Sequence, residues 1–96
     1  MPATQPPVIL LTGATSGIGQ ATARQLATAD ARLILHGRTE AKARAACEEL
    51  ADHATAELEP EAADLADLDA VRALAGRVRQ RHQNLDVLIN NAGLAG

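Results

Sequence analysis

Three closely spaced glycines are the first candidates for chemistry in this chain. Gly13, Gly17 and Gly19 fall within seven residues and follow an unbroken apolar run at residues 8–11. Glycine permits backbone angles and close approaches that a Cβ atom would forbid. The residues after Gly19 are rich in helix formers, so the free N–H groups of a first helical turn would point back at the glycines. Helix starts of this kind attract anions, and the pattern predicts a pyrophosphate-binding turn between a buried strand and a helix.

The spacing of the glycines narrows the kind of phosphate site. A P-loop needs Gly-Lys-Ser/Thr after four intervening residues, but Ile18 stands at that point and no lysine follows it. The general dinucleotide fingerprint also has another order of glycines. The string from Thr12 to Gly19 resembles the Thr-Gly-x-x-x-Gly-x-Gly turn of the short-chain dehydrogenase/reductase family. For a glycine triplet by itself, a flexible surface loop is the alternative interpretation.

A second string, Asn90-Asn91-Ala92-Gly93, is similar to the Asn-Asn-Ala-Gly string of the same family. The resemblance implies that Asn90 braces the sheet through hydrogen bonds to neighbouring backbone. It also implies that Asn91, Ala92 and Gly93 face the nucleotide. Asparagine-rich turns are common, so the string gains its weight from its separation from the glycine turn.

The residues after the second and third expected strands would read the adenosine end of a cofactor. Gly37 stands where the resemblance places an acidic residue, and Arg38 follows it. A guanidinium can bind a 2′-phosphate in bidentate fashion, which favours NADP(H) over NAD(H), although NAD(H) stays open. The alternative for Arg38 is an exposed arginine at a helix start. The family's counterparts of Asp64 and Leu65 meet the adenine, whereas the alternative role of Asp64 is to cap a turn.

The resemblance thus assigns most of the polar positions to cofactor binding. Ser16 would add a hydroxyl to the phosphate that Arg38 binds. The full set of expected cofactor contacts is Gly13, Thr15, Ser16, Gly17, Ile18, Gly19, Arg38, Asp64, Leu65, Asn91, Ala92 and Gly93.

Strands and helices must alternate to position these residues. We expect strands at residues 8–11, 31–36 and 86–90 and a short strand within 55–63, a first helix near 18–28, and two further helices that begin after residues 39 and 67. Thr39 and Asp67 are the expected N-caps. Such alternation predicts an α/β fold, a Rossmann-like doubly wound parallel sheet in the order 3-2-1-4. Residues 1–7 are expected to be a flexible lead-in, and residues 8–96 a partial NAD(P)-binding domain that ends before the catalytic segment.

Apolar spacing predicts which side chains face the sheet. Pro60 places the third strand at an edge, and the strand at 86–90 is expected to be buried. Three basic side chains, Arg77, Arg79 and Arg81, are expected on a solvated surface because they spread around their helix. The expected inward residues are Ile18, Ala21 or Thr22, and Leu26 on the first helix, Ala43, Ala46, Cys47 and Leu50 on the second, and Leu68, Val71, Leu74, Ala75 and Val78 on the third.

Composition limits the class of protein. The 96 residues are 47% hydrophobic and 22% charged, which indicates one small globular domain. A net charge of −3 offers no basic face for nucleic acid or acidic lipid. The single Cys47 is expected to pack as an unreactive apolar residue, and His36, His53 and His82 have no metal-ligand spacing. Without a signal peptide or a membrane span, a cytoplasmic location is expected.

The catalytic residues of the family have no counterpart in these 96 residues. The family uses a serine, a tyrosine and a lysine four residues after the tyrosine, but this sequence has no tyrosine and its single lysine is Lys42. We expect a piece of a homo-oligomeric NADP-dependent oxidoreductase that transfers hydride between NADP(H) and a carbonyl or alcohol. On its own the chain would bind cofactor at most. The alternative is a non-catalytic nucleotide-binding or subunit-interaction module.

Overall fold

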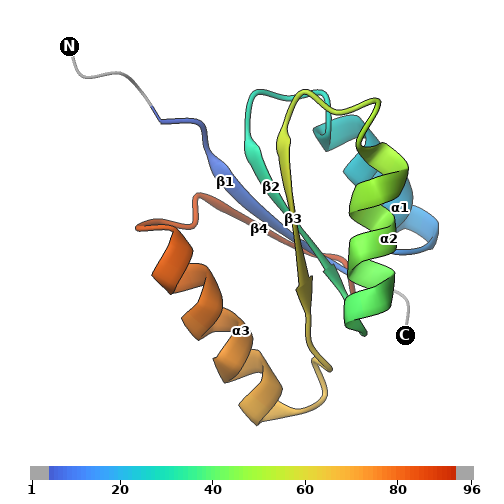
Figure 1. The fold of residues 1–96 in the computed structure, drawn as a ribbon. Coiled ribbons are helices and arrows are strands. Elements are labelled where there is room, and N and C mark those ends of the chain that lie inside the picture. Colours follow the sequence, from blue (N-terminus) through green and yellow to red (C-terminus); the bar gives the residue numbers. More distant parts are fainter. Residues whose placement is uncertain (1–4, 93–96) are drawn as a thin grey trace.

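Four parallel strands and three helices alternate along the chain (Figure 1). The computed structural model describes residues 5–92. The strands are paired in the order β3-β2-β1-β4, which confirms the expected doubly wound arrangement. Their bounds are β1 Val8–Thr12, α1 Gly17–Leu26, β2 Arg32–Gly37, α2 Glu40–Leu50, β3 Glu57–Ala62, α3 Leu68–Arg81 and β4 Val87–Asn90.

The sheet is covered by helices on both faces (Figure 1). Leu11 and Leu33 belong to an apolar cluster that also contains residues of α1 and α2. Leu10 and Ile34 belong to a second cluster with residues of α3. The two clusters lie on opposite faces because side chains alternate along a strand. The central strands β1 and β2 are therefore buried on both sides, as their unbroken apolar runs predict.

The two N-caps predicted from the sequence are confirmed. Thr39 Oγ1 accepts a hydrogen bond from the Lys42 N–H at 3.2 Å at the start of α2. Asp67 Oδ1 accepts from the Asp69 N–H at 2.9 Å at the start of α3. On α2, Ala43, Ala46 and Leu50 are buried as expected, with Cys47 half-buried beside them.

The inward face of α1 differs from the prediction. Ile18 is 71% exposed, whereas Gly19, Ala23 and Ala27 are buried. The difference arises because Gly19 packs against the backbone of Gly13, which turns the preceding side chain outward. Ala21 is also exposed, and Leu26 only borders the core. Alanines in the buried stripe let the helix lie close to the sheet.

The inward face of α3 is likewise rotated from the predicted one. Leu74 and Val78 are buried as expected, but Leu68 is 61% exposed and Ala75 is exposed. The buried residues of α3 pack against side chains of β1 and β2, while its arginines contact β3. Arg79 and Arg81 are exposed as predicted, but Arg77 is half-buried, and Arg77 and Arg81 face one shared partner, which the prediction did not expect.

Arg77 and Arg81 form ion pairs with carboxylates of β3. Arg77 Nε lies 2.7 Å from Glu61 Oε1, and Arg81 Nη2 lies 2.7 Å from Glu61 Oε2. Arg81 Nε also lies 3.0 Å from Glu59 Oε1. The two arginines are four residues apart and therefore lie on the same face of the helix. The prediction considered only the two-residue spacing between neighbouring arginines. Glu61, only 5% exposed, is a buried charge with two guanidinium partners.

The outer edge of β3 is protected from further strand pairing. The N–H groups of Glu57 and Ala63 donate to the carbonyls of Ala31, just before β2, and Gly37, at its end. The backbone groups of residues 58, 60 and 62 therefore point away from β2, toward the open edge. Pro60 occupies an outward position and has no N–H to offer. Arg77 Nη2 donates to the outward Ala62 carbonyl at 2.9 Å. The edge position predicted from Pro60 is confirmed.

The strand β4 is not buried, contrary to the prediction. Val87 is 42% exposed and Leu88 is 58% exposed. β4 pairs with β1 on one side, and within residues 5–92 no strand pairs with its other side. Its apolar sequence therefore meets partners over only part of its surface.

No helix in the described part of the chain is long and apolar enough to cross a membrane.

Replacement of Glu61 by alanine should destabilise the fold. The change leaves Arg77 without its carboxylate partner and removes one of two from Arg81, and we expect a loss of about 1–2 kcal/mol in unfolding free energy. Urea denaturation measures this loss. Glu40→Ala is the matched control, because Glu40 pairs with Arg44 at the surface and such pairs contribute only about 0.3–0.5 kcal/mol. Equal losses of unfolding free energy in the two variants would contradict a stabilising role for the ion pairs between α3 and β3.

The Cys47 thiol should react slowly with alkylating agents. Burial, with contributions from Glu59 and Glu48, raises the pKa of Cys47 from 9.0 to about 11. The raised pKa leaves less Cys47 thiolate at a given pH, although a thiolate of higher pKa is the better nucleophile. The first effect is the larger, so we expect alkylation at least about tenfold slower than for a free thiol. Iodoacetamide labelling followed by mass spectrometry measures the rate. Unfolding in urea should restore the ordinary rate, and a fast reaction in the native protein would contradict this assignment.

Candidate functional site

A cleft of about 670 Å³ opens at the carboxyl ends of the strands. Parallel sheets of this topology place ligands at that end. The cleft gathers residues from the segments that follow all four strands. Its lining residues are Gly13, Thr15, Ser16, Gly17, Ile18, His36, Arg38, Ala63, Asp64, Leu65, Ala66, Asn91 and Ala92.

Most residues selected from the sequence meet in this cleft. Of the expected contacts, Gly19 does not line it but lies beneath the glycine turn, and Gly93 lies outside the described residues. All the others do line it. His36, Ala63 and Ala66 also line the cleft, and nothing in the sequence pattern assigned them to it.

The three glycines of the turn are required for different reasons. Gly13 and Gly17 have φ angles of 64° and 58°, which side-chain-bearing residues rarely adopt. Gly19 has no such angle, but a Cβ atom there would lie 1.8 Å from the Gly13 carbonyl oxygen. The spacing recognised in the sequence thus corresponds to two left-handed residues and one close backbone contact.

Side chains from two other segments hold the Gly13 peptide groups in place. Asn91 Nδ2 donates a hydrogen bond to the Gly13 carbonyl at 3.1 Å. The Gly13 N–H donates to His36 Nδ1 at 3.0 Å. His36 is 3% exposed, and its Nε2 lies 2.8 Å from the Ala63 carbonyl oxygen. The turn is therefore fixed from both sides.

Thr12 joins the end of β1 to the segment after β4. Its Oγ1 accepts hydrogen bonds from the N–H groups of Asn91 at 3.0 Å and Ala92 at 3.2 Å. The same hydroxyl lies 3.1 Å from Asn90 Oδ1, to which it can donate. The side chain that bonds to neighbouring backbone is thus that of Asn91, while Asn90 contacts Thr12. Among the described residues the Asn90 side chain bonds to a side chain rather than to the expected backbone, while Asn91 and Ala92 line the cleft as expected.

The start of α1 is open to an anion. Ser16 is the N-cap residue, yet its side chain makes no capping hydrogen bond. The first turn of α1 holds no acidic residue. Its free N–H groups carry the positive end of the helix dipole. Because Ser16 and Gly17 line the cleft, this end of the helix suits a phosphate.

Arg38 and Asp64 face each other loosely across the cleft. Arg38 Nη2 lies 3.9 Å from Asp64 Oδ2, and the Arg38 side chain is 76% exposed. Such a pair contributes little to stability, so the guanidinium is free to bind a ligand phosphate. Asp64 Oδ1 accepts from the Ala66 N–H at 3.0 Å, which is the turn-capping role. Its contact with adenine stays a prediction.

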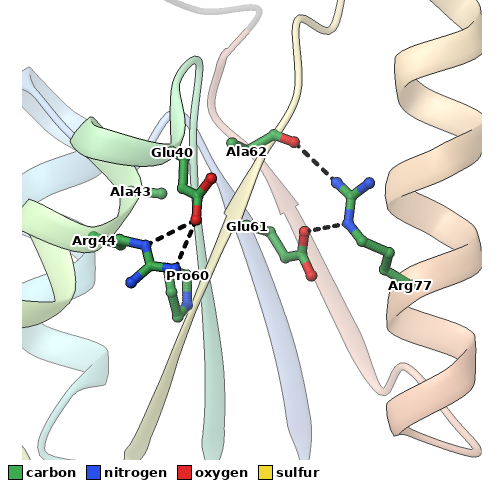
Figure 2. A pocket seen from close by; sticks show the side chains of 7 residues that line it. All are labelled: Glu40, Ala43, Arg44, Pro60, Glu61, Ala62 and Arg77. Atoms are coloured by element: carbon green, nitrogen blue, oxygen red, sulfur yellow. Dashed lines mark hydrogen bonds and ion pairs between the residues drawn. The ribbon is translucent and has the colours of Figure 1, made fainter.

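A second hollow, of about 420 Å³, lies beside β3 but offers no comparable chemistry (Figure 2). Its charged side chains are already paired: Arg44 with Glu40 at 2.6 Å and Arg77 with Glu61 at 2.7 Å. A ligand would have to break these contacts. Within residues 5–92 there is also no cluster of three potential metal ligands.

Comparison with known proteins identifies the family. The model of the short chain dehydrogenase family matches residues 7–96. The chain is 40% identical over 95 residues to the short-chain dehydrogenase anuI of Penicillium roqueforti, covering 98% of this chain and 38% of that protein. It is 42% identical over 85 residues to the putative daunorubicin C-13 ketoreductase DnrU of a Streptomyces species, covering 88% and 30%. The chain thus spans about a third of the length of these curated relatives.

Solved structures show the same fold. A metagenomic short-chain oxidoreductase in complex with NADP superposes with a TM-score of 0.77 at 40% identity, covering 85% of this chain and 37% of that one. The F189W actinorhodin polyketide ketoreductase with NADPH gives a TM-score of 0.80 at 38% identity, covering 93% and 34%. With its glycine turn, strand order and family match, the chain belongs to the short-chain dehydrogenase family.

Proposed function

We propose that the cleft binds NADP(H) and that the whole protein, of whose relatives this chain spans about a third, transfers hydride between this cofactor and a carbonyl or alcohol substrate. The observation that carries the proposal is the rigid glycine turn, which lies beside the uncapped start of α1 in a cleft that also contains Arg38. The donors suit a dinucleotide, because backbone N–H groups and a guanidinium both bind phosphate. A Cβ at Gly19 would collide with this turn, so the turn depends on glycine at that position.

The adenosine end and the diphosphate of the cofactor have residues in the cleft that fit them. The diphosphate would lie against the N–H groups of the first turn of α1, and Arg38 and Ser16 would bind the 2′-phosphate. Asp64 Oδ2, which accepts no hydrogen bond from the turn, would accept one from the adenine amine, with Leu65 beside the ring. Asn91 and Ala92 would line the ribose and diphosphate region.

The nicotinamide supplies the hydride, and the protein must orient the ring and provide a proton donor. The residues of this chain contribute to orienting the cofactor. They include no tyrosine, and Lys42 lies on α2 rather than in the cleft. We therefore propose that these 96 residues alone bind the cofactor without catalysing hydride transfer. Relatives are named as ketoreductases, dehydrogenases and an L-sorbose reductase complexed with NADPH, which supports a carbonyl or alcohol substrate class.

Arg38→Ala should weaken NADPH binding selectively. Loss of the guanidinium removes a charge-assisted contact with the 2′-phosphate, and we expect about a tenfold or greater rise in the Kd for NADPH. The Kd for NADH should change less than about twofold, since NADH has no 2′-phosphate. Isothermal titration calorimetry measures both constants. Arg44→Ala is the control, because Arg44 is an exposed arginine outside the cleft. Equal losses for the two cofactors would refute the role of Arg38.

Gly19→Ala should abolish nucleotide binding. The new Cβ would lie 1.8 Å from the Gly13 oxygen, so the turn or α1 must shift. Gly76→Ala is the matched control, since Gly76 lies within α3 and a Cβ there meets nothing within 4 Å. The control should bind normally and be stabilised by up to about 1 kcal/mol. Fluorescence titration with NADPH and thermal unfolding measure the two effects, and normal binding by Gly19→Ala would rule out this cofactor site.

A further inference from the structure

We propose that His36 is a positioning residue that holds the glycine turn only in its neutral form, so that proton uptake by His36 weakens nucleotide binding. The inference rests on the proposed function, because it concerns the same cleft. It starts from a side chain that the cofactor contacts do not require. His36 lies at the floor of the cleft, is 3% exposed and has both ring nitrogens within hydrogen-bond distance of backbone groups.

The partners of His36 determine its tautomer. The Gly13 N–H can only donate, so Nδ1 must present its lone pair at 3.0 Å. The Ala63 carbonyl can only accept, so Nε2 must carry the hydrogen at 2.8 Å. One neutral form therefore satisfies both contacts. The ring then connects the turn after β1 to the segment that follows β3.

Protonation would break one of these two contacts. A hydrogen on Nδ1 would point at the Gly13 N–H, and two donors facing each other at 3.0 Å must move apart. The Gly13 carbonyl is held by Asn91 and lies against Gly19 at the start of α1. A shift of the Gly13 N–H therefore disturbs the turn that would receive the diphosphate. A bound diphosphate would attract the imidazolium but cannot replace the lost acceptor.

The charged groups around His36 leave it without a carboxylate partner. Glu61 is opposite His36 in the register of β2 and β3, but its oxygens are taken by Arg77 and Arg81 of α3. Arg38 on the segment after β2 and Asp64 after β3 are near each other. The strand β1, the turn and the start of α1, residues 8–20, contain no charged side chain. Within the described residues, the hydrogen bonds of the ring go to backbone groups only.

Two substitutions separate the contacts of His36. In His36→Asn the amide oxygen can occupy the place of Nδ1 and accept from Gly13, but the side chain is too short to reach Ala63. In His36→Gln the amide nitrogen can reach Ala63 but offers no acceptor to Gly13. Each variant keeps one of the two hydrogen bonds, so similar losses of stability are expected. Only the asparagine variant keeps the turn anchored, and its amide does not titrate.

The test measures the affinity for ADP-ribose at about pH 8 and about pH 5.5. ADP-ribose is chosen because the 2′-phosphate of NADP(H) would itself titrate in this range. We expect the wild-type affinity to fall about fivefold to tenfold on acidification, the value of one lost hydrogen bond. His36→Asn should bind nearly as well as the wild type at the higher pH and change less than about twofold between the two. His36→Gln should bind weakly at both, and the exposed-site control His53→Asn should follow the wild type.

Equal behaviour of the asparagine and glutamine variants, or a wild-type pH dependence in His36→Asn, would overturn the proposal. A second measurement needs no nucleotide and no variant: the hydrogen exchange and chemical shift of the Gly13 amide followed by ¹⁵N NMR across the same range. Gly13 should lose protection as His36 takes up a proton, and constant protection would also overturn the proposal. If the wild type binds neither ADP-ribose nor NADPH, the proposed function fails while the amide measurement still decides the role of His36.

Discussion

The arrangement of the cleft depends on the Gly13 peptide groups being fixed from both sides. A glycine in a left-handed conformation has no side chain with which to hold itself, so its position must be set by its neighbours. Here Asn91 binds the carbonyl and His36 accepts from the N–H. Thr12 in turn fixes the backbone of Asn91. Because these side chains come from the ends of β1, β2 and β4, correct strand pairing is what brings the turn into its binding geometry.

The two faces of the sheet secure this pairing by different means. On the side of α1 and α2 the core is an apolar cluster, with alanines that allow the helices to approach closely. On the side of α3 a small apolar cluster is supplemented by ion pairs between α3 and β3. A chain without aromatic residues has less apolar area per side chain to bury.

The sequence predicted the topology, the two caps and the edge position of β3 because each depends on local chemistry. Glycine spacing, Thr39, Asp67 and Pro60 constrain the backbone near themselves, whatever the rest of the chain does. The errors concern the direction of side chains relative to distant partners. Ile18 turns outward only because Gly19 meets Gly13, and the partners of Arg77 lie across the space between α3 and β3. Such relations appear only once the elements are packed.

The residue that sequence patterns missed, His36, shows the same limit in the site itself. Searching for histidines at metal-ligand spacing tests one use of the side chain and says nothing of its use as a bridge between backbone groups. The useful signal was its position: a histidine at the end of an otherwise aliphatic buried strand must satisfy two ring nitrogens without water. The nearest backbone groups at that end of the sheet are those of the glycine turn and of the segment after β3. A polar residue at the carboxyl end of a buried parallel strand is therefore a candidate to position the neighbouring turn, even when it contacts no ligand.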